Sequence, residues 1–151
     1  MERVIFAGGC FWGLEHYFLE VKGIISTSVG YTGGCKEYPT YKEVCREDTG
    51  HAEAVEVVYD PSVTSFEELV KLFFKTHDPT QVNKQGPDVG SQYRSEIFYL
   101  NGEQKIISEK LIKMLEDKGY IVTTKVTKAT TFWKAEEYHQ DYYKKSHLKG
   151  R

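Results

Sequence analysis

The stretch AEAVEVVYDPSVTSFEELVKLFF, residues 52–74, contains the two patterns on which the fold prediction depends. Its first part, residues 52–59, is rich in valine like a strand and stops at Asp60-Pro61. Ser65 then begins a helix, because a serine followed three residues later by a glutamate forms a capping box. The apolar side chains after it form one helical stripe: Phe66, Leu69, Val70 and Phe73. A strand followed by an amphipathic helix is typical of a sheet covered by helices.

The rest of the chain continues this grouping of strands and helices. The patterns predict strands over residues 4–7, 24–31, 95–100 and 121–129, helices over residues 11–21 and 103–118, and one helical turn or more within residues 135–142. Two long irregular segments, residues 32–50 and 77–93, separate these elements, and loops of such length in compact domains are commonly functional. We therefore predict an α+β fold: a two-layer sandwich with helices on one side of a mixed sheet and long functional loops.

The composition is that of one ordinary globular domain spanning residues 1–151. With 20 basic and 22 acidic side chains, the charge gives no broad reason to bind nucleic acid or a membrane surface. There is neither a membrane-length apolar run nor a secretory signal, so we expect a monomer in the cytoplasm. The sequence has three cysteines, Cys10, Cys35 and Cys45. They lack the spacing that is typical of a zinc site. We expect no metal and no cofactor.

Cys10 is the first candidate for chemistry. It follows Gly8-Gly9 at a strand end and opens a predicted helix, where free backbone N–H groups and the helix dipole favour a thiolate. A helix terminus contributes only about 0.3–1 kcal/mol, so a second group has to activate the thiol. The alternative is that Cys10 is a small buried apolar residue, but the two glycines favour a reactive role because they let a ligand approach closely.

Glu53 is the most informative carboxylate. Side chains alternate faces along a strand, so Glu53 points the same way as Val55, Val57 and Tyr59. A carboxyl group on an apolar face loses hydration, which raises its pKa and keeps it protonated near neutrality. A neutral carboxyl is able to act as a general acid. The alternative is a residue at the strand end that reaches solvent.

Aromatic residues and one aspartate complete the candidate site. Phe11 belongs to the core stripe of the first helix, whereas Trp12 points about 100° away and is a candidate wall for a substrate. Tyr41 and Tyr93 lie in the two irregular segments, where a phenol is able to donate a hydrogen bond to a developing oxyanion. Asp88 lies in Gly-Pro-Asp-Val-Gly, and shaping a turn is its simplest role.

Several blocks of this sequence resemble, in the same order, those of the A class of peptide methionine sulfoxide reductases. They are Gly-Cys-Phe-Trp-Gly at 9–13, Gly-Tyr-Thr-Gly-Gly at 30–34, Pro-Thr-Tyr at 39–41, Glu-Val-Cys at 43–45, Thr-Gly-His-Ala-Glu-Ala-Val at 49–55, His-Asp-Pro-Thr-Gln at 77–81, Gly-Ser-Gln-Tyr-Arg-Ser at 90–95 and Ala-Glu-Glu-Tyr-His-Gln-Asp-Tyr at 135–142. These blocks span nearly the whole chain.

The resemblance implies a catalytic Cys10, a pocket for the substrate methyl group made by Phe11 and Trp12, and a proton-donating Glu53. It also implies residues that bind the sulfoxide oxygen or order the site: Tyr41, Tyr93 and Asp88. The implied substrate is methionine-S-sulfoxide, free or in oxidised proteins, the implied fold is a ferredoxin-like plait, and Cys10 becomes a sulfenic acid during the reaction. A peptide-binding module and a Cys10 redox sensor are the alternatives, and the pairing of Cys10 with Glu53 argues against both.

Oxidised Cys10 has to be reduced before a second turnover. In one common pattern of the family, the cysteines that do this lie in a glycine-rich tail, and this sequence departs from that pattern. Here the last cysteine is Cys45. Cys35, Cys45 or an external thiol such as thioredoxin therefore has to reduce Cys10. We favour Cys35 as the resolving thiol, because it follows two glycines and lies six residues before Tyr41, and we expect Cys45 to be structural.

Overall fold

The computed structural model describes residues 1–149, with side chains through residue 145; residues 150 and 151 of the predicted domain lie outside the described part. In chain order the elements are β1 (Glu2–Ala7), α1 (Phe11–Leu19), β2 (Ile24–Thr32), α2 (Tyr41–Cys45), β3 (Ala52–Tyr59), α3 (Phe66–Thr76), β4 (Lys84–Gln85), β5 (Asp88–Val89), the 3₁₀ turn η1 (Ser91–Tyr93), β6 (Glu96–Tyr99), α4 (Gly102–Asp117), β7 (Lys125–Lys128), β8 (Trp133–Lys134), the 3₁₀ turn η2 (Glu137–His139) and α5 (Tyr142–Lys149).

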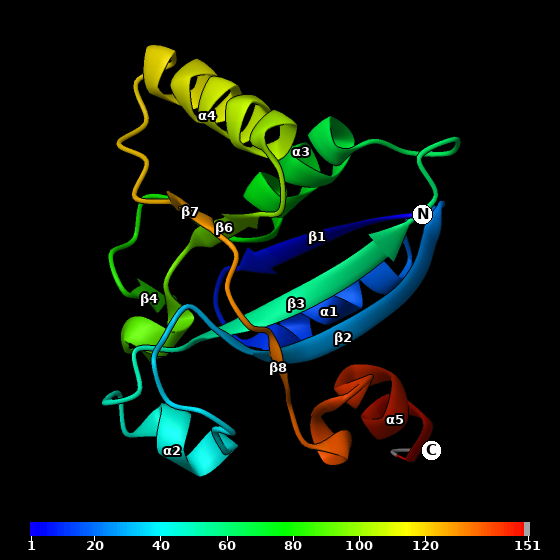
Figure 1. The fold of residues 1–151 in the computed structure, drawn as a ribbon, viewed down its shortest axis with the longest axis vertical. Helices are drawn as coiled ribbons and strands as arrows, with labels where there is room; N and C mark the ends of the chain where they lie inside the picture. The colour runs from blue at the N-terminus through cyan, green and yellow to red at the C-terminus, as the bar shows by residue number, and fades with distance from the viewer. Residues whose placement is uncertain (150–151) are drawn as a thin grey trace.

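Six of the described strands form one sheet in the order β7-β6-β1-β3-β2-β8. Neighbouring strands are antiparallel, except that β6 and β7 are parallel. Figure 1 shows β1, β3 and β2 side by side, with α1 behind them and α3 and α4 at one end of the molecule. The sheet is therefore mixed and mostly antiparallel, and the predicted α+β class is confirmed.

Two apolar clusters lie on the two faces of the sheet. The larger one joins α1 and α3 to the sheet through stacked rings, with the Phe6 ring centroid 4.6 Å from that of Phe73 and 5.5 Å from that of Phe18. The smaller one contains Ile5, Ala7, Ala52, Ala54 and Phe98. Because side chains alternate along β3, Val55 and Val57 join the helical layer while Ala52 and Ala54 face away from it.

The strand predicted over residues 121–129 begins only at Lys125. Thr123 instead forms hydrogen bonds to the irregular segment before β4. Its N–H and its hydroxyl both donate to the Pro79 carbonyl, at 2.7 and 2.9 Å. The predicted loop over residues 32–50 also contains α2, which starts at a capping box made by Thr40 and Glu43. Beyond the predicted turn near residues 135–142, the chain continues into α5. In the described residues, no helix has the length and apolarity of a membrane span.

Candidate active site

Cys10 is the residue immediately before α1, three residues after β1 ends at Ala7. Gly9 has a backbone φ of +91°, which residues with a side chain rarely adopt. Its N–H donates a hydrogen bond to the Tyr93 carbonyl at 3.2 Å. A Cβ on Gly8 would lie 2.9 Å from the Phe73 ring. The two glycines therefore let the chain turn sharply and bring Cys10 next to the segment that carries Tyr93.

The Cys10 side chain is partly buried, and the pKa of its thiol is raised to about 11. Burial is the main cause and the charge of Glu53 is the second, while the N–H groups of Trp12 and Gly13 lower the pKa. The helix start thus acts in the predicted direction, but burial outweighs it. Cys10 is a neutral thiol in the resting site.

Glu53 is only 1% exposed and lies on the helical face of β3, as the alternation predicts. Its Oε1 accepts a hydrogen bond from the Phe11 N–H at 3.1 Å, and its Oε2 has no partner in the described part of the chain. Burial raises its pKa from the ordinary 4.5 to about 8, although the Phe11 N–H acts against the shift. The carboxyl is therefore protonated at neutral pH, and its free oxygen is able to donate.

Tyr41 and Tyr93 approach Glu53 from two different segments. The N–H of Tyr41, at the start of α2, donates to Glu136 Oε2 at 3.1 Å, and the Tyr31 hydroxyl donates to Glu136 Oε1 at 2.8 Å. Burial and the charge of Glu53 raise the pKa of both tyrosines, that of Tyr93 to about 12. Both phenols therefore keep their protons and remain hydrogen-bond donors.

Asp88 also belongs to this neighbourhood. It lies in the short β4–β5 hairpin, and its charge contributes to the raised pKa values of Cys10, Glu53 and Tyr93. The fold thus brings together Cys10, Glu53, Tyr41, Tyr93 and Asp88, which the sequence places in four separate segments.

An aromatic wall stands beside Cys10. Phe11 is fully buried, as predicted, and Trp12 is partly buried against a segment from the other end of the chain. The Trp12 indole N–H donates to His139 Nδ1 at 2.9 Å, and its ring stacks on Tyr142 with centroids 3.8 Å apart. The His139 ring lies 4.5 Å from that of Tyr41.

Glu136, His139 and Tyr142 were not predicted as site residues. All three lie in the block at 135–142 that resembles the family, so the block was a usable signal for this wall.

The two remaining cysteines lie on different sides of α2. Cys35 is exposed, and its sulfur lies 3.7 Å from the Thr49 carbonyl, in a recess shared with Glu43 and Arg46. Cys45 ends α2 and is also exposed; Val44 is the buried residue of this helix. Cys45 is thus not one of the buried core residues of the described chain.

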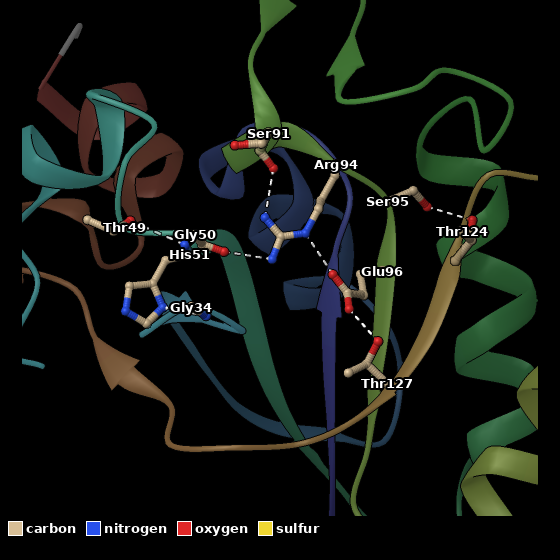
Figure 2. A network of polar contacts seen from close by, with 10 residues as sticks. All are labelled: Gly34, Thr49, Gly50, His51, Ser91, Arg94, Ser95, Glu96, Thr124 and Thr127. Carbon is tan, nitrogen blue, oxygen red and sulfur yellow. Dashed lines mark hydrogen bonds and ion pairs between the residues drawn. The ribbon is translucent and has the colours of Figure 1, made fainter. Parts of the chain in front are cut away.

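Figure 2 shows a network of polar contacts in which Arg94 has several partners. The guanidinium pairs with Glu96 at 2.7 Å and also donates to the carbonyls of Ser91 and Gly50, each at 2.9 Å. Gly50 precedes β3, which carries Glu53, and Ser91 begins the turn that carries Tyr93. One side chain therefore ties together the two segments that deliver the acid and a phenol.

Comparison with known proteins agrees with this geometry. The family model described as peptide methionine sulfoxide reductase matches residues 2–150. The peptide methionine sulfoxide reductase MsrA of Methanosarcina acetivorans is 51% identical over 148 residues, which cover 96% of this chain and 79% of that protein.

Two solved structures of Mxr1 from Saccharomyces cerevisiae have the same fold. The reduced form matches with a TM-score of 0.90 at 38% identity, over 95% of this chain and 84% of that one. Mxr1 in complex with Trx2 matches with a TM-score of 0.66 at 26% identity, over 93% of this chain and 84% of that one.

The fold and the comparisons together define an oxidoreductase. The chain belongs to the peptide methionine sulfoxide reductase family, in its A class. It is an enzyme that reduces methionine sulfoxide.

The titration of Glu53 should be visible in stability. Between about pH 4.5 and 8 the folded chain holds a proton that the unfolded chain has released, so this group makes stability fall as pH rises. The slope is about 1.4 kcal/mol per pH unit. Urea unfolding of Glu53→Gln from pH 5 to 8 should show a flatter dependence than wild type, whereas Glu56→Gln should keep the wild-type slope. Equal slopes for wild type and Glu53→Gln would contradict a raised pKa.

Loss of the Arg94 contacts should impair turnover more than binding. Arg94→Lys keeps the charge but cannot make all three contacts, so Glu53 and Tyr93 lose their fixed spacing. Displacement on the scale of 1 Å costs up to about 10²-fold in rate, so we expect kcat to fall roughly ten- to hundredfold with a smaller change in KM. The control is Arg3→Lys, which alters an exposed pair with Glu56. Similar kinetics for the two variants would refute the positioning role.

Proposed function

We propose that the enzyme reduces methionine-S-sulfoxide, free or within oxidised proteins, through a Cys10 sulfenic acid, with Glu53 as the proton donor. The observation that carries this proposal is the buried Glu53 carboxyl, protonated at neutral pH and with Oε2 unpartnered within the described residues, close enough to raise the pKa of Cys10. A sulfoxide sulfur becomes electrophilic only when its oxygen is protonated or strongly hydrogen-bonded. Glu53 is the group that supplies this proton.

The first step balances within the site. Glu53 gives its proton to the sulfoxide oxygen, with Tyr41 and Tyr93 donating hydrogen bonds to that oxygen. The Cys10 thiol gives up its proton, which returns Glu53 to the neutral form. The Cys10 sulfur attacks the activated sulfoxide sulfur and a transient bond joins the two sulfur atoms. As that bond and the substrate S–O bond break, the oxygen passes to the Cys10 sulfur and methionine leaves. Cys10 is oxidised by two electrons to the sulfenic acid, and the substrate sulfur is reduced by two.

The coupling between the two groups explains the high resting pKa of Cys10. A thiolate formed alone would lie beside a carboxyl in a poorly hydrated site, which costs free energy. Proton transfer from Glu53 to the substrate removes this cost, because the Glu53 carboxylate that results accepts the thiol proton of Cys10. The nucleophile is thus activated mainly when a sulfoxide is bound.

Phe11 and Trp12 are proposed to hold the substrate methyl group. The Trp12 ring is fixed by His139 and Tyr142, which gives the pocket a rigid apolar wall. Such a wall beside directed donors to oxygen distinguishes the two epimers at sulfur, and the proposed preference is for the S form. Asp88 is proposed to help order the site.

An external thiol completes the cycle, and protein repair under oxidative stress is the proposed purpose. Thioredoxin is the favoured reductant, because the related Mxr1 has a solved complex with Trx2. The Cys10 sulfenic acid is reduced by Cys35, as the sequence predicts, by Cys45, or directly by the external thiol. The composition favours a cytoplasmic monomer.

Replacing the nucleophile should abolish the reaction. Cys10→Ser should form no methionine from S-sulfoxide with dithiothreitol as reductant, while its thermal unfolding stays close to wild type because the substitution changes one partly buried atom. Turnover of dabsyl-methionine sulfoxide measures this directly. Near wild-type turnover by Cys10→Ser would reject the mechanism.

Replacing the acid should slow the chemical step specifically. General acid catalysis contributes about 10²–10⁴-fold, so Glu53→Gln should lower the rate of the first turnover by an amount in that range. The matched control, Glu56→Gln, changes the same residue type on the other face of β3 and should have little effect. Rapid-quench measurement of methionine formation separates the two variants, and equal losses would show that Glu53 is not the proton donor.

A further inference from the structure

The mechanism so far gives no role to Cys45, the last residue of α2. Burial and the charge of Glu53 raise the pKa of Cys45, and a hydrogen bond with Tyr41 acts against this shift. The charge of Cys45 in turn contributes to the raised pKa values of Tyr41 and Tyr93. Glu53, Tyr41 and Tyr93 are therefore neighbours of Cys45 as well as of Cys10.

The geometry of α2 explains this placement. Tyr41 and Cys45 are four residues apart on one helix, so their side chains lie on the same face. Tyr41 points into the site, with its ring centroid 6.3 Å from Phe11 and 4.5 Å from His139. Cys45 follows the same direction, whereas the residues of the opposite face point away from the site.

Cys35 lies on that opposite face. Side chains advance by about 100° per residue in a helix, so Glu43 and Arg46 project away from the direction of Tyr41 and Cys45. Cys35 shares a recess with these two residues, and its neighbour Lys36 pairs with Glu43 at 3.5 Å. The Cys35 N–H also donates to the Thr49 carbonyl at 3.0 Å, which fixes it on the outer side of the loop.

From this arrangement we propose that Cys45, rather than Cys35, is the thiol that resolves the Cys10 sulfenic acid, through a Cys10–Cys45 disulfide. This inference rests on the proposed function, because it needs a sulfenic acid at Cys10. The Cys45 sulfur attacks the Cys10 sulfur, an S–S bond forms, and the S–O bond breaks. The oxygen leaves as water with the thiol proton of Cys45. Cys45 is oxidised, and the sulfenic sulfur of Cys10 is reduced to the disulfide level.

Bond formation requires the two Cα atoms to come within about 7 Å of each other. α2 is suited to such an approach because it has only five residues, of which Val44 alone is buried. Helices this short are marginal without tertiary packing, and segments with few buried contacts open at low free-energy cost. The capping box at Thr40 and the contact between Glu136 and Tyr41 anchor the first turn of α2.

Because Cys45 is exposed, an external thiol is able to reach and reduce the Cys10–Cys45 disulfide. Cys10 is partly buried behind the aromatic wall, whereas Cys45 is exposed. An external dithiol therefore attacks the Cys45 sulfur, forms a mixed disulfide there and releases Cys10 as the leaving thiol. The second thiol of the reductant then frees Cys45.

The test uses the full chain and one equivalent of L-methionine-S-sulfoxide without reductant. After reaction, free thiols are blocked with N-ethylmaleimide and the protein is mapped without reduction by mass spectrometry. A peptide joining Cys10 to Cys45 is expected in wild type and in the matched control Cys35→Ser. In Cys45→Ser, Cys10 should remain a sulfenic acid and react with dimedone.

Turnover supplies the second measurement. Cys45→Ser should still form one equivalent of methionine, which shows that the site is folded, but its turnover with thioredoxin should fall at least tenfold. Cys35→Ser should keep wild-type turnover. A Cys10–Cys35 peptide, or a dimedone-reactive Cys10 in wild type, would overturn the inference. If wild type forms no methionine in this single turnover, the proposed function itself fails, so the two failures are distinguishable.

Discussion

Burial of the Glu53 carboxyl under the first N–H group of α1 is the contact on which the rest of the site depends. An ionised carboxylate in that position would lose most of its hydration for one hydrogen bond, so the neutral form is favoured. The same contact fixes the distance between β3 and the start of α1, where Cys10 lies. The fold therefore sets the protonation state of Glu53 and the position of Cys10 together.

Four groups of the resting site, Cys10, Glu53, Tyr41 and Tyr93, are held in their uncharged forms mainly by burial. Burial and the potential charge of Glu53 raise the pKa values of Cys10, Tyr41 and Tyr93, so no thiolate or phenolate accumulates. Thiolates are the species that oxidants attack, so a neutral Cys10 is protected from oxidation in the absence of substrate. The helix start at Cys10 supplies stabilisation for negative charge that is used only as charge develops on the sulfur.

Local patterns in the sequence were sufficient for strands β1, β2, β3 and β6, the long helices and the face of Glu53, because strand alternation and helical periodicity are short-range properties. They did not reveal the two-residue edge strand β8. They were insufficient for α2, since a five-residue helix between glycines has too little periodicity, although Thr40 and Glu43 carry a capping signal. The strand expected from residue 121 starts late because Thr123 bonds to Pro79, a partner 44 residues away. The roles of Glu136 and His139 depend on contacts across about the whole chain, which no local pattern encodes.

The stacking of Trp12 on Tyr142 joins the two ends of the described chain in one pocket wall. A protein made from its N-terminus on the ribosome has Cys10 outside the tunnel long before Tyr142 is synthesised. Until the segment with His139 and Tyr142 emerges and folds against α1, the Trp12 ring beside Cys10 has no fixed position. The wall around Trp12 therefore forms only after Tyr142 has been synthesised and has folded against α1.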